Sequence, residues 1–231
     1  MNRRRYLQTA ASLAAIGLAG CGGSVGEDGA HTPTPTAPTP TIQHDSTRIV
    51  SDGDDRPWVR AAFSNTGDAP HGRLEVRYTV QDATGNVVST QSSLVDYIPA
   101  GKTWLDYQIV TGGQRSRAET VDVTVLADGG GVESERIDGI IVTSSTLSKD
   151  YQSETEIVGE LDIDRAYESL YLVGSLLTDS GQLRGTVGTI LRDVEIGSRS
   201  FDARIADHRT PKNRSGALPT DHDIRLFEDI P

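Results

Sequence analysis

Cysteine and lysine are scarce in this chain, and both shortages limit the classes of protein to which it can belong. The one cysteine, Cys21, excludes a disulfide within a single chain and any zinc site built on several cysteines. Core burial alone must therefore hold the folded part together. Lysine occurs only three times in 231 residues, whereas aspartate outnumbers glutamate by 22 to 11.

The charge balance is strongly acidic. Without Arg3, Arg4 and Arg5 the chain has 22 − 3 = 19 basic residues against 33 acidic ones, a net charge of 19 − 33 = −14. At about 1 M salt the Debye length is only about 3 Å, so this charge repels little there, but in dilute buffer it opposes compaction. Dense aspartate with scarce lysine resembles a haloarchaeal protein. Nucleic acid is not an expected partner, because phosphate binding needs basic patches.

Catalytic signatures are also missing. The sequence contains no Gly-x-Ser-x-Gly elbow, His-Glu-x-x-His pair, P-loop or dinucleotide glycine signature, and it has no β-α-β alternation. No two histidines have the spacing of a ligand pair on a strand or helix. We therefore predict a protein that is not an enzyme and has no cofactor and no metal. The histidines are His31, His44, His71, His208 and His222.

Four polar clusters have a plain and a functional interpretation. Asp52–Asp55 resembles a fragment of a calcium loop, and Asp221–Asp223 flanks a histidine, but in so acidic a chain composition explains both. Asp162 and Asp164 lie on one face of a predicted strand, either as its polar edge or as a carboxylate pair. Asn213 begins an Asn-Arg-Ser sequon and is a possible N-glycosylation site.

Residues 1–20 read as a twin-arginine lipoprotein signal peptide. Arg3 and Arg4 supply the export signal, and the apolar run Ala10–Gly20 is too short to span a membrane. Leu18-Ala-Gly-Cys21 resembles a lipobox, so we predict that Cys21 is lipidated. An uncleaved anchor or an ordinary secretory site is the alternative. The predicted location is the extracytoplasmic face of the cell membrane.

Residues 21–46 form a predicted disordered linker. Its tract Thr32–Thr41 alternates threonine and proline and favours extended polyproline II at roughly 3 Å per residue. The ten residues span roughly 30 Å, enough to hold a domain away from a membrane. The threonines are either O-glycan acceptors or part of a plain spacer.

A stretch of 36 residues occurs twice without a gap, at 74–109 and 170–205. Alternation in Leu74–Val80 indicates a half-buried strand, and Gly85 with its counterpart Gly181 supplies a tight turn. Short strands between Gly and Pro turns predict an all-β fold of two immunoglobulin-like sandwiches, at 47–131 and 132–231. Paired apolar residues should share their burial. The pairs are Leu94 with Ile190, Ile98 with Val194, and Leu105 with Phe201.

The hairpin also resembles the FxLYD-type domain, a small immunoglobulin-like sandwich of prokaryotic surface lipoproteins. The motif falls on Tyr78–Asp82, with Ala61, Asn65 and Gly67 at the preceding turn. The second copy keeps turn residues of the motif but departs from it elsewhere, with Gly174 in place of the aromatic and Ile163 in place of the asparagine. The turn residues that it keeps are Gly159, Asp179, Gly181 and Gly197. The resemblance implies a tandem pair without a defined activity.

The aromatic residues gather in the first sandwich and serve either as core or as a recognition patch. Together these features predict a membrane-anchored, non-enzymatic interaction module that binds another envelope or surface protein. The alternative is an accessory or ligand-binding subunit of a transporter or envelope enzyme. The aromatic residues concerned are Trp58, Tyr78, Tyr97, Trp104 and Tyr107.

Overall fold

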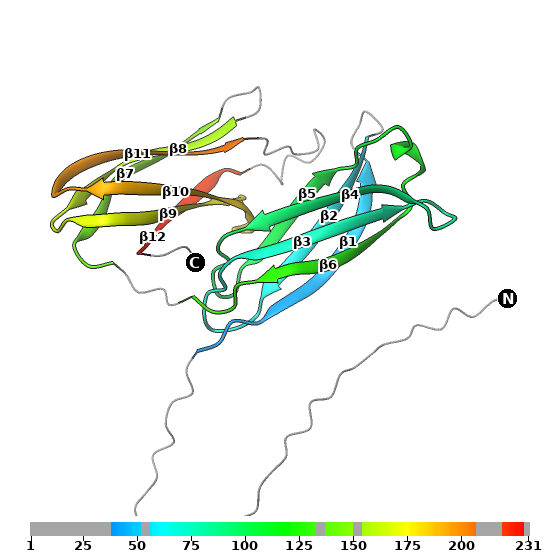
Figure 1. Ribbon diagram of the computed structural model, residues 1–231, viewed down its shortest axis with the longest axis horizontal. Coiled ribbons are helices and arrows are strands. Elements are labelled where there is room, and N and C mark those ends of the chain that lie inside the picture. Colours follow the sequence, from blue (N-terminus) through cyan, green and yellow to red (C-terminus); the bar gives the residue numbers. More distant parts are fainter. Residues whose placement is uncertain (1–37, 52–55, 133–136, 150–153, 207–218, 229–231) are drawn as a thin grey trace, which may run out of the picture. The chain divides into compact units, whose positions relative to one another are not determined.

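Strands make up almost all of the regular structure, which confirms the predicted all-β class. A computed structural model describes residues 38–51, 56–132, 137–149, 154–206 and 219–228. These ranges contain twelve strands and one short 3-10 helix, Arg115–Arg117 (Figure 1). No helix among the described residues has the length and apolar character needed to cross a membrane. The described residues belong to one compact unit.

The first half of the fold contains six strands: β1 (Ile42–Ser51), β2 (Pro57–Asn65), β3 (Leu74–Gln81), β4 (Val87–Val95), β5 (Thr103–Ile109) and β6 (Thr120–Asp128). They form the sheets β1-β2-β5 and β4-β3-β6, which face each other (Figure 1). Phe63, Tyr78 and Trp104 fill the core between the sheets. In immunoglobulin-type sandwiches a sheet with the order A-B-E faces a sheet with the order C′-C-F. The orders β1-β2-β5 and β4-β3-β6 correspond to these.

The second half also contains six strands: β7 (Ile140–Lys149), β8 (Glu154–Ile163), β9 (Tyr167–Leu177), β10 (Leu183–Val194), β11 (Gly197–Ala206) and β12 (Asp221–Phe227). Its sheets are β7-β8-β11 and β10-β9-β12, so adding six to each strand number converts the first half into the second. Leu161, Leu172 and Phe201 are among its core residues. The shared order is independent support for the duplication read from the sequence.

The two hairpin turns match in detail. The amides of Asp82 and Thr178 each donate to the carbonyl four residues on, both at 2.9 Å. Gly85 and Gly181 follow at the same place with φ of 85° and 73°, a conformation that suits glycine. The prediction of two equivalent glycine turns is confirmed.

The two halves also share two β-bulges. In the hairpins the extra residue is Val88 on β4 and Arg184 on β10, 96 positions apart. On the first strands the extra residue is Asp45 on β1 and Thr143 on β7. A bulge inserts one residue into a ladder at a defined place, so two matching pairs of bulges are hard to obtain without a common origin.

A single sheet connects the two halves. Edge strand β5 pairs in parallel with edge strand β10 through Trp104 and Leu183, which gives the order β1-β2-β5-β10-β9-β12. Leu183 is fully buried and belongs to the core of the first half.

Two burial predictions need correction. Leu94 and Ile190 were expected inside, yet both are exposed, because they lie opposite Glu75 and Tyr171 on the outer faces of their sheets. Directly opposed residues of antiparallel strands share a face. Ile98 and Val194 are both buried, as predicted.

The third pair, Leu105 and Phe201, is buried as predicted but on different faces. Leu105 packs with Trp58 on the side of its sheet away from the first core, whereas Phe201 lies inside the second core. Residues 96–102 connect β4 to β5, but only residues 195–196 connect β10 to β11. Asp106 pairs with Ala61 on β2, and Phe201 pairs with Gly159 at the equivalent place on β8, so the gapless correspondence slips by one residue after the hairpin.

Candidate functional site

Several predicted site residues lie outside the described residues, so the structure gives no account of them. They include the export signal, the lipidation site and the sequon. These residues are Arg3, Arg4, Cys21, His31, Asp52, Asp54, Asp55, His208 and Asn213.

The described histidines lie apart from one another. The His44 ring stacks on Phe63 with centroids 5.0 Å apart, and His222 Nε2 lies 2.9 Å from Ser145 Oγ. His71, which sequence reasoning did not single out, is buried. Its Nε2 lies 2.8 Å from Asp128 Oδ1, and its Nδ1 lies 2.8 Å from the carbonyl oxygen of Gly72. Within the described ranges no three His, Cys, Asp or Glu side chains are grouped to hold a metal ion.

The end of the Thr/Pro tract is fastened to the first half by residues 65–68, which we name the stalk clamp. The amide of Thr39 donates to Asp68 Oδ1 at 2.7 Å, and the amide of Thr41 donates to Asn65 Oδ1 at 3.2 Å. In return, the amide of Thr66 donates to the carbonyl of Thr41 at 2.8 Å. The last residues of the tract are therefore held by backbone and side-chain bonds before β1 begins.

Asn65 is the centre of the clamp. Its side chain is buried, and its Oδ1 accepts a second bond from the amide of Gly67 at 3.1 Å. Its Nδ2 donates to the carbonyls of Ala69 and Ile98 at 2.8 and 3.1 Å. The carboxamide thus uses both donors and both acceptor positions, so any other side chain would leave several buried polar groups without partners.

Gly67 is required by close approach. A Cβ at this position would meet the carbonyl oxygen of Thr39 and lie 2.7 Å from Pro40 Cα. Only glycine lets the tract pass this closely over the loop.

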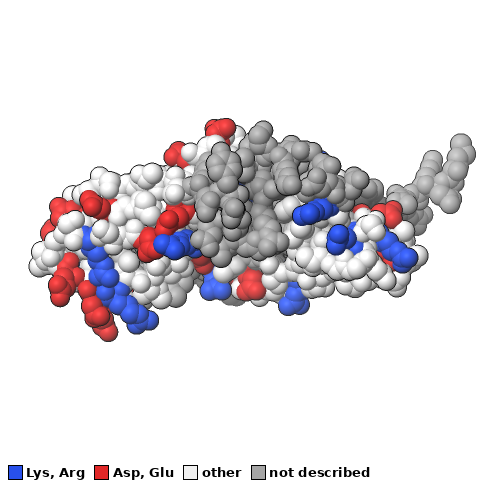
Figure 2. All heavy atoms as spheres, turned by 90° about the horizontal axis from the view of Figure 1, so that it is seen from above, with Lys and Arg blue, Asp and Glu red and all other residues white. Residues whose placement is uncertain are grey.

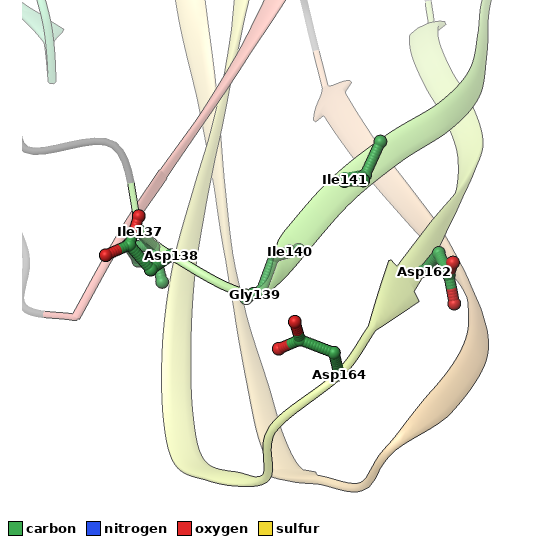
Figure 3. A pocket seen from close by; sticks show the side chains of 7 residues that line it. All are labelled: Ile137, Asp138, Gly139, Ile140, Ile141, Asp162 and Asp164. Atoms are coloured by element: carbon green, nitrogen blue, oxygen red, sulfur yellow. The ribbon is translucent and has the colours of Figure 1, made fainter.

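The second half repeats this arrangement only in part. The amide of Asp164 donates to the carbonyl of Gly139 at 2.8 Å, at the place where Thr66 donates to Thr41. Ile163 stands where the first half has Asn65, so the carboxamide hub is missing. A hollow of about 410 Å³ lies here instead, and Asp164 points toward Gly139 across it (Figure 3). The other lining residues are Ile137, Asp138, Ile140, Ile141 and Asp162.

Arg184 joins the two halves from its bulged position. Its guanidinium lies over the Tyr107 ring, 4.5 Å from the centroid, and NH1 donates to the carbonyl of Leu105. Burial lowers the pKa of Arg184 to about 10, so it remains a cation near neutral pH. Alignment of the two copies within this chain offers one signal for Arg184, because it stands where the first copy has the apolar Val88.

A second contact between the halves centres on Asp96, in the loop after β4. Its amide donates to Thr186 Oγ1 at 2.8 Å, and Tyr171 bonds its carboxylate. Burial raises the pKa of Asp96, and burial beside this carboxylate raises the pKa of Tyr171 to about 12. The neighbouring Tyr97 ring packs against Phe227, with centroids 5.5 Å apart.

Inside the first core, Tyr78 donates its hydroxyl to Asp106 Oδ2 at 2.7 Å. Burial, and then the Asp106 carboxylate, raise the pKa of Tyr78. Gln108 Nε2 donates to Asp106 Oδ1 at 3.0 Å, so the carboxylate has a partner on each oxygen. These buried polar groups are all engaged within the protein.

The aromatic residues of the first half are core residues, which settles the choice left open by the sequence. Trp104 and Tyr107 lie on opposite faces of β5, as alternation requires, but both are buried. Trp58, Tyr78 and Tyr97 are buried as well. On the described surface drawn in Figure 2, basic and acidic side chains are interspersed.

Comparison with known proteins gives no family. No family model matches the sequence, and no curated protein matches it. Several chains of solved structures match, and two of them have little sequence identity and low TM-scores. Red sea bream transglutaminase is 10% identical over 84% of this chain, with a TM-score of 0.27. The C-terminal globular domain of an oligosaccharyltransferase from Pyrococcus abyssi is 8% identical over 80%, with a TM-score of 0.17. This chain spans 31% and 44% of their respective lengths.

Proposed function

We propose that this protein is a non-enzymatic lipoprotein that presents two tandem domains, 47–131 and 132–231, to another envelope or surface protein. Cys21 holds it to the extracytoplasmic face of the membrane after twin-arginine export through Arg3 and Arg4, and both domains are of the FxLYD type. The order of small residues before Cys21 and the Thr/Pro tract after it support this reading.

The observation that carries the proposal is the stalk clamp. Thr39 and Thr41 are bonded to the first half, so the spacer runs directly into the fold. A spacer that is fastened in this way suits an anchored protein that presents its folded part to a partner at the surface. In contrast, the buried polar side chains Arg184, Asp96 and Asp106 bond within the fold rather than converging on a substrate cavity.

The second candidate function is an accessory or ligand-binding subunit of a transporter or envelope enzyme. The hollow at Gly139 favours it, because isoleucines and the three aspartates Asp138, Asp162 and Asp164 line it. Small ligands bind in concave sites of this general composition. The volume of about 410 Å³ lies in the range of such sites.

Crosslinking in native membranes followed by mass spectrometry tests the proposal, with Cys21→Ser as the matched control. We expect a lipid mass on the wild-type N-terminus, retention in the membrane fraction, and crosslinks to one envelope protein that Cys21→Ser loses. Equal membrane retention of both chains without any lipid mass would refute the anchor. Crosslinks to a transporter or enzyme that need the hollow residues would favour the second candidate.

A further inference from the structure

We propose that the stalk clamp carries tension from the membrane anchor into the fold, so that a pull on the stalk loads more than the first strand. This inference rests on the proposed anchoring through Cys21. It concerns a different part of the chain, namely the contact between Thr39–Thr41 and residues 65–68.

The clamp lies where a pull on the stalk reaches the sheet. Strand β1 begins at Ile42, and its first register partner on β2 is Asn65. Without a clamp, a pull on the stalk would load this terminal pair first and peel β1 from β2 one bond at a time. The bonds of Thr39 and Thr41 lie ahead of that pair and share the load.

The clamp is also attached to the contact between the halves. The backbone amide of Asn65 donates to the carbonyl of Lys102, and the amide of Gly101 donates to the backbone carbonyl of Asn65, both at 2.9 Å. These partners belong to residues 96–102, the loop whose Asp96 and Tyr97 pack on the second half. A pull on the stalk is therefore transmitted through Asn65 to both halves and not to β1 alone.

The second half provides an internal comparison. Its first strand, β7, follows residue 139 with the equivalent backbone bond, but Ile163 replaces Asn65 and the hollow takes the place of the clamp. Residue 139 lies within the chain and bears no anchor. Among the described residues, the full set of clamp bonds is thus found only where, under the proposal, the anchored end joins the fold.

The test uses the mature, non-lipidated chain from residue 22, so it does not depend on the anchor. Gly67→Ala adds a methyl group that collides with Thr39 while it keeps every hydrogen-bonding group. Asp68→Ala removes one acceptor, and Asp68→Asn restores a side-chain oxygen. Gly113→Ala, in open space, is the matched control.

Amide hydrogen exchange gives the first readout. We expect Thr39 and Thr41 to be protected in wild type and in Gly113→Ala. Asp68→Ala should speed exchange at Thr39 by roughly five- to tenfold, the effect of one lost hydrogen bond, and Asp68→Asn should restore protection. Gly67→Ala should expose both amides. Unprotected Thr39 and Thr41 in wild type would overturn the clamp, even if Cys21 proved to be lipidated.

Single-molecule pulling gives the second readout. One handle is at the C-terminus, and the other is either at the N-terminus of the stalk or at Thr84 in the exposed β3–β4 turn. Gly67→Ala should lower the rupture force only when the load enters through the stalk. An equal loss in both geometries would mean general destabilisation, and no loss in either would mean that the clamp carries no tension. Both results would overturn the proposal.

Discussion

Val88 and Arg184 hold the same bulged position in the two hairpins, but their side chains contact different halves of the fold. Val88 packs against the core of its own half, whereas Arg184 reaches across to Tyr107 and Leu105 of the other half. Arg184 therefore adds a side-chain contact to the backbone pairing of Trp104 with Leu183 between the halves. One charged residue at the second position gives the edge of β10 a specific partner on β5.

Replacing Arg184 with valine should weaken this contact. The substitution removes a desolvated cation–π contact and a charged hydrogen bond, so we expect a loss of about 1–3 kcal/mol in the free energy of unfolding. Denaturant unfolding should then separate into two transitions as the halves lose their coupling. Arg77→Val, on the exposed face of β3, is the control and should change little. A more stable or unchanged Arg184→Val protein would contradict this role.

The two turn glycines should be equally intolerant of alanine. Gly85 and Gly181 both have positive φ, where an L-residue costs about 1–2 kcal/mol. Because the space around Gly85 is open, the penalty there comes from backbone conformation alone. Gly113→Ala, without positive φ and in open space, should be neutral or slightly stabilising. Thermal unfolding measures all three, and a harmless Gly85→Ala would argue against the turn assignment.

The features that sequence predicted well are those that depend on local pattern. Alternation in Leu74–Val80 and the glycines of the turns were enough for the strand class and the duplication. Strand β9 begins at Tyr167 and includes Leu170, where the second copy of the repeat starts. These features need only nearest neighbours along the chain or across one hairpin.

The features that sequence missed depend on contacts between distant strands. Leu94 looks like a core residue until its partner Glu75 is known, because a bulge changes which face each residue takes. His71 and Arg184 are buried by segments remote in sequence, and neither stands in a recognisable motif. Asn65 was noted as a turn residue, but its role in the clamp depends on where Thr41 passes.

Salt should stabilise the mature chain. Its net charge of −14 repels itself in dilute buffer, and molar salt reduces the Debye length to about 3 Å. We expect the melting temperature, measured by circular dichroism, to rise from dilute to molar KCl. Sucrose, which favours compact states without screening charge, is the control. An equal melting temperature at both salt concentrations would show that the acidic surface does not limit stability.

Acidification should strengthen the contact around Asp96, and Asp96→Asn should abolish this effect. Burial raises the folded-state pKa of Asp96, while Arg73 and Tyr171, the charged and titratable groups beside it, oppose the shift only in part. Between the unfolded pKa near 4 and the raised folded pKa, the folded state binds more protons, so stability falls as pH rises through this window.

Asparagine at position 96 cannot ionise and retains an oxygen toward Thr186. The stability gained by Asp96→Asn should therefore be absent in acid and grow toward neutral pH. Urea unfolding in molar salt across that range measures it, with the exposed Asp122→Asn as control. A difference that is constant with pH would mean that Asp96 does not titrate in the folded contact, and the loop after β4 would then join the halves by the bond from the Asp96 amide to Thr186 and by packing of Tyr97 on Phe227, without a contribution from ionisation.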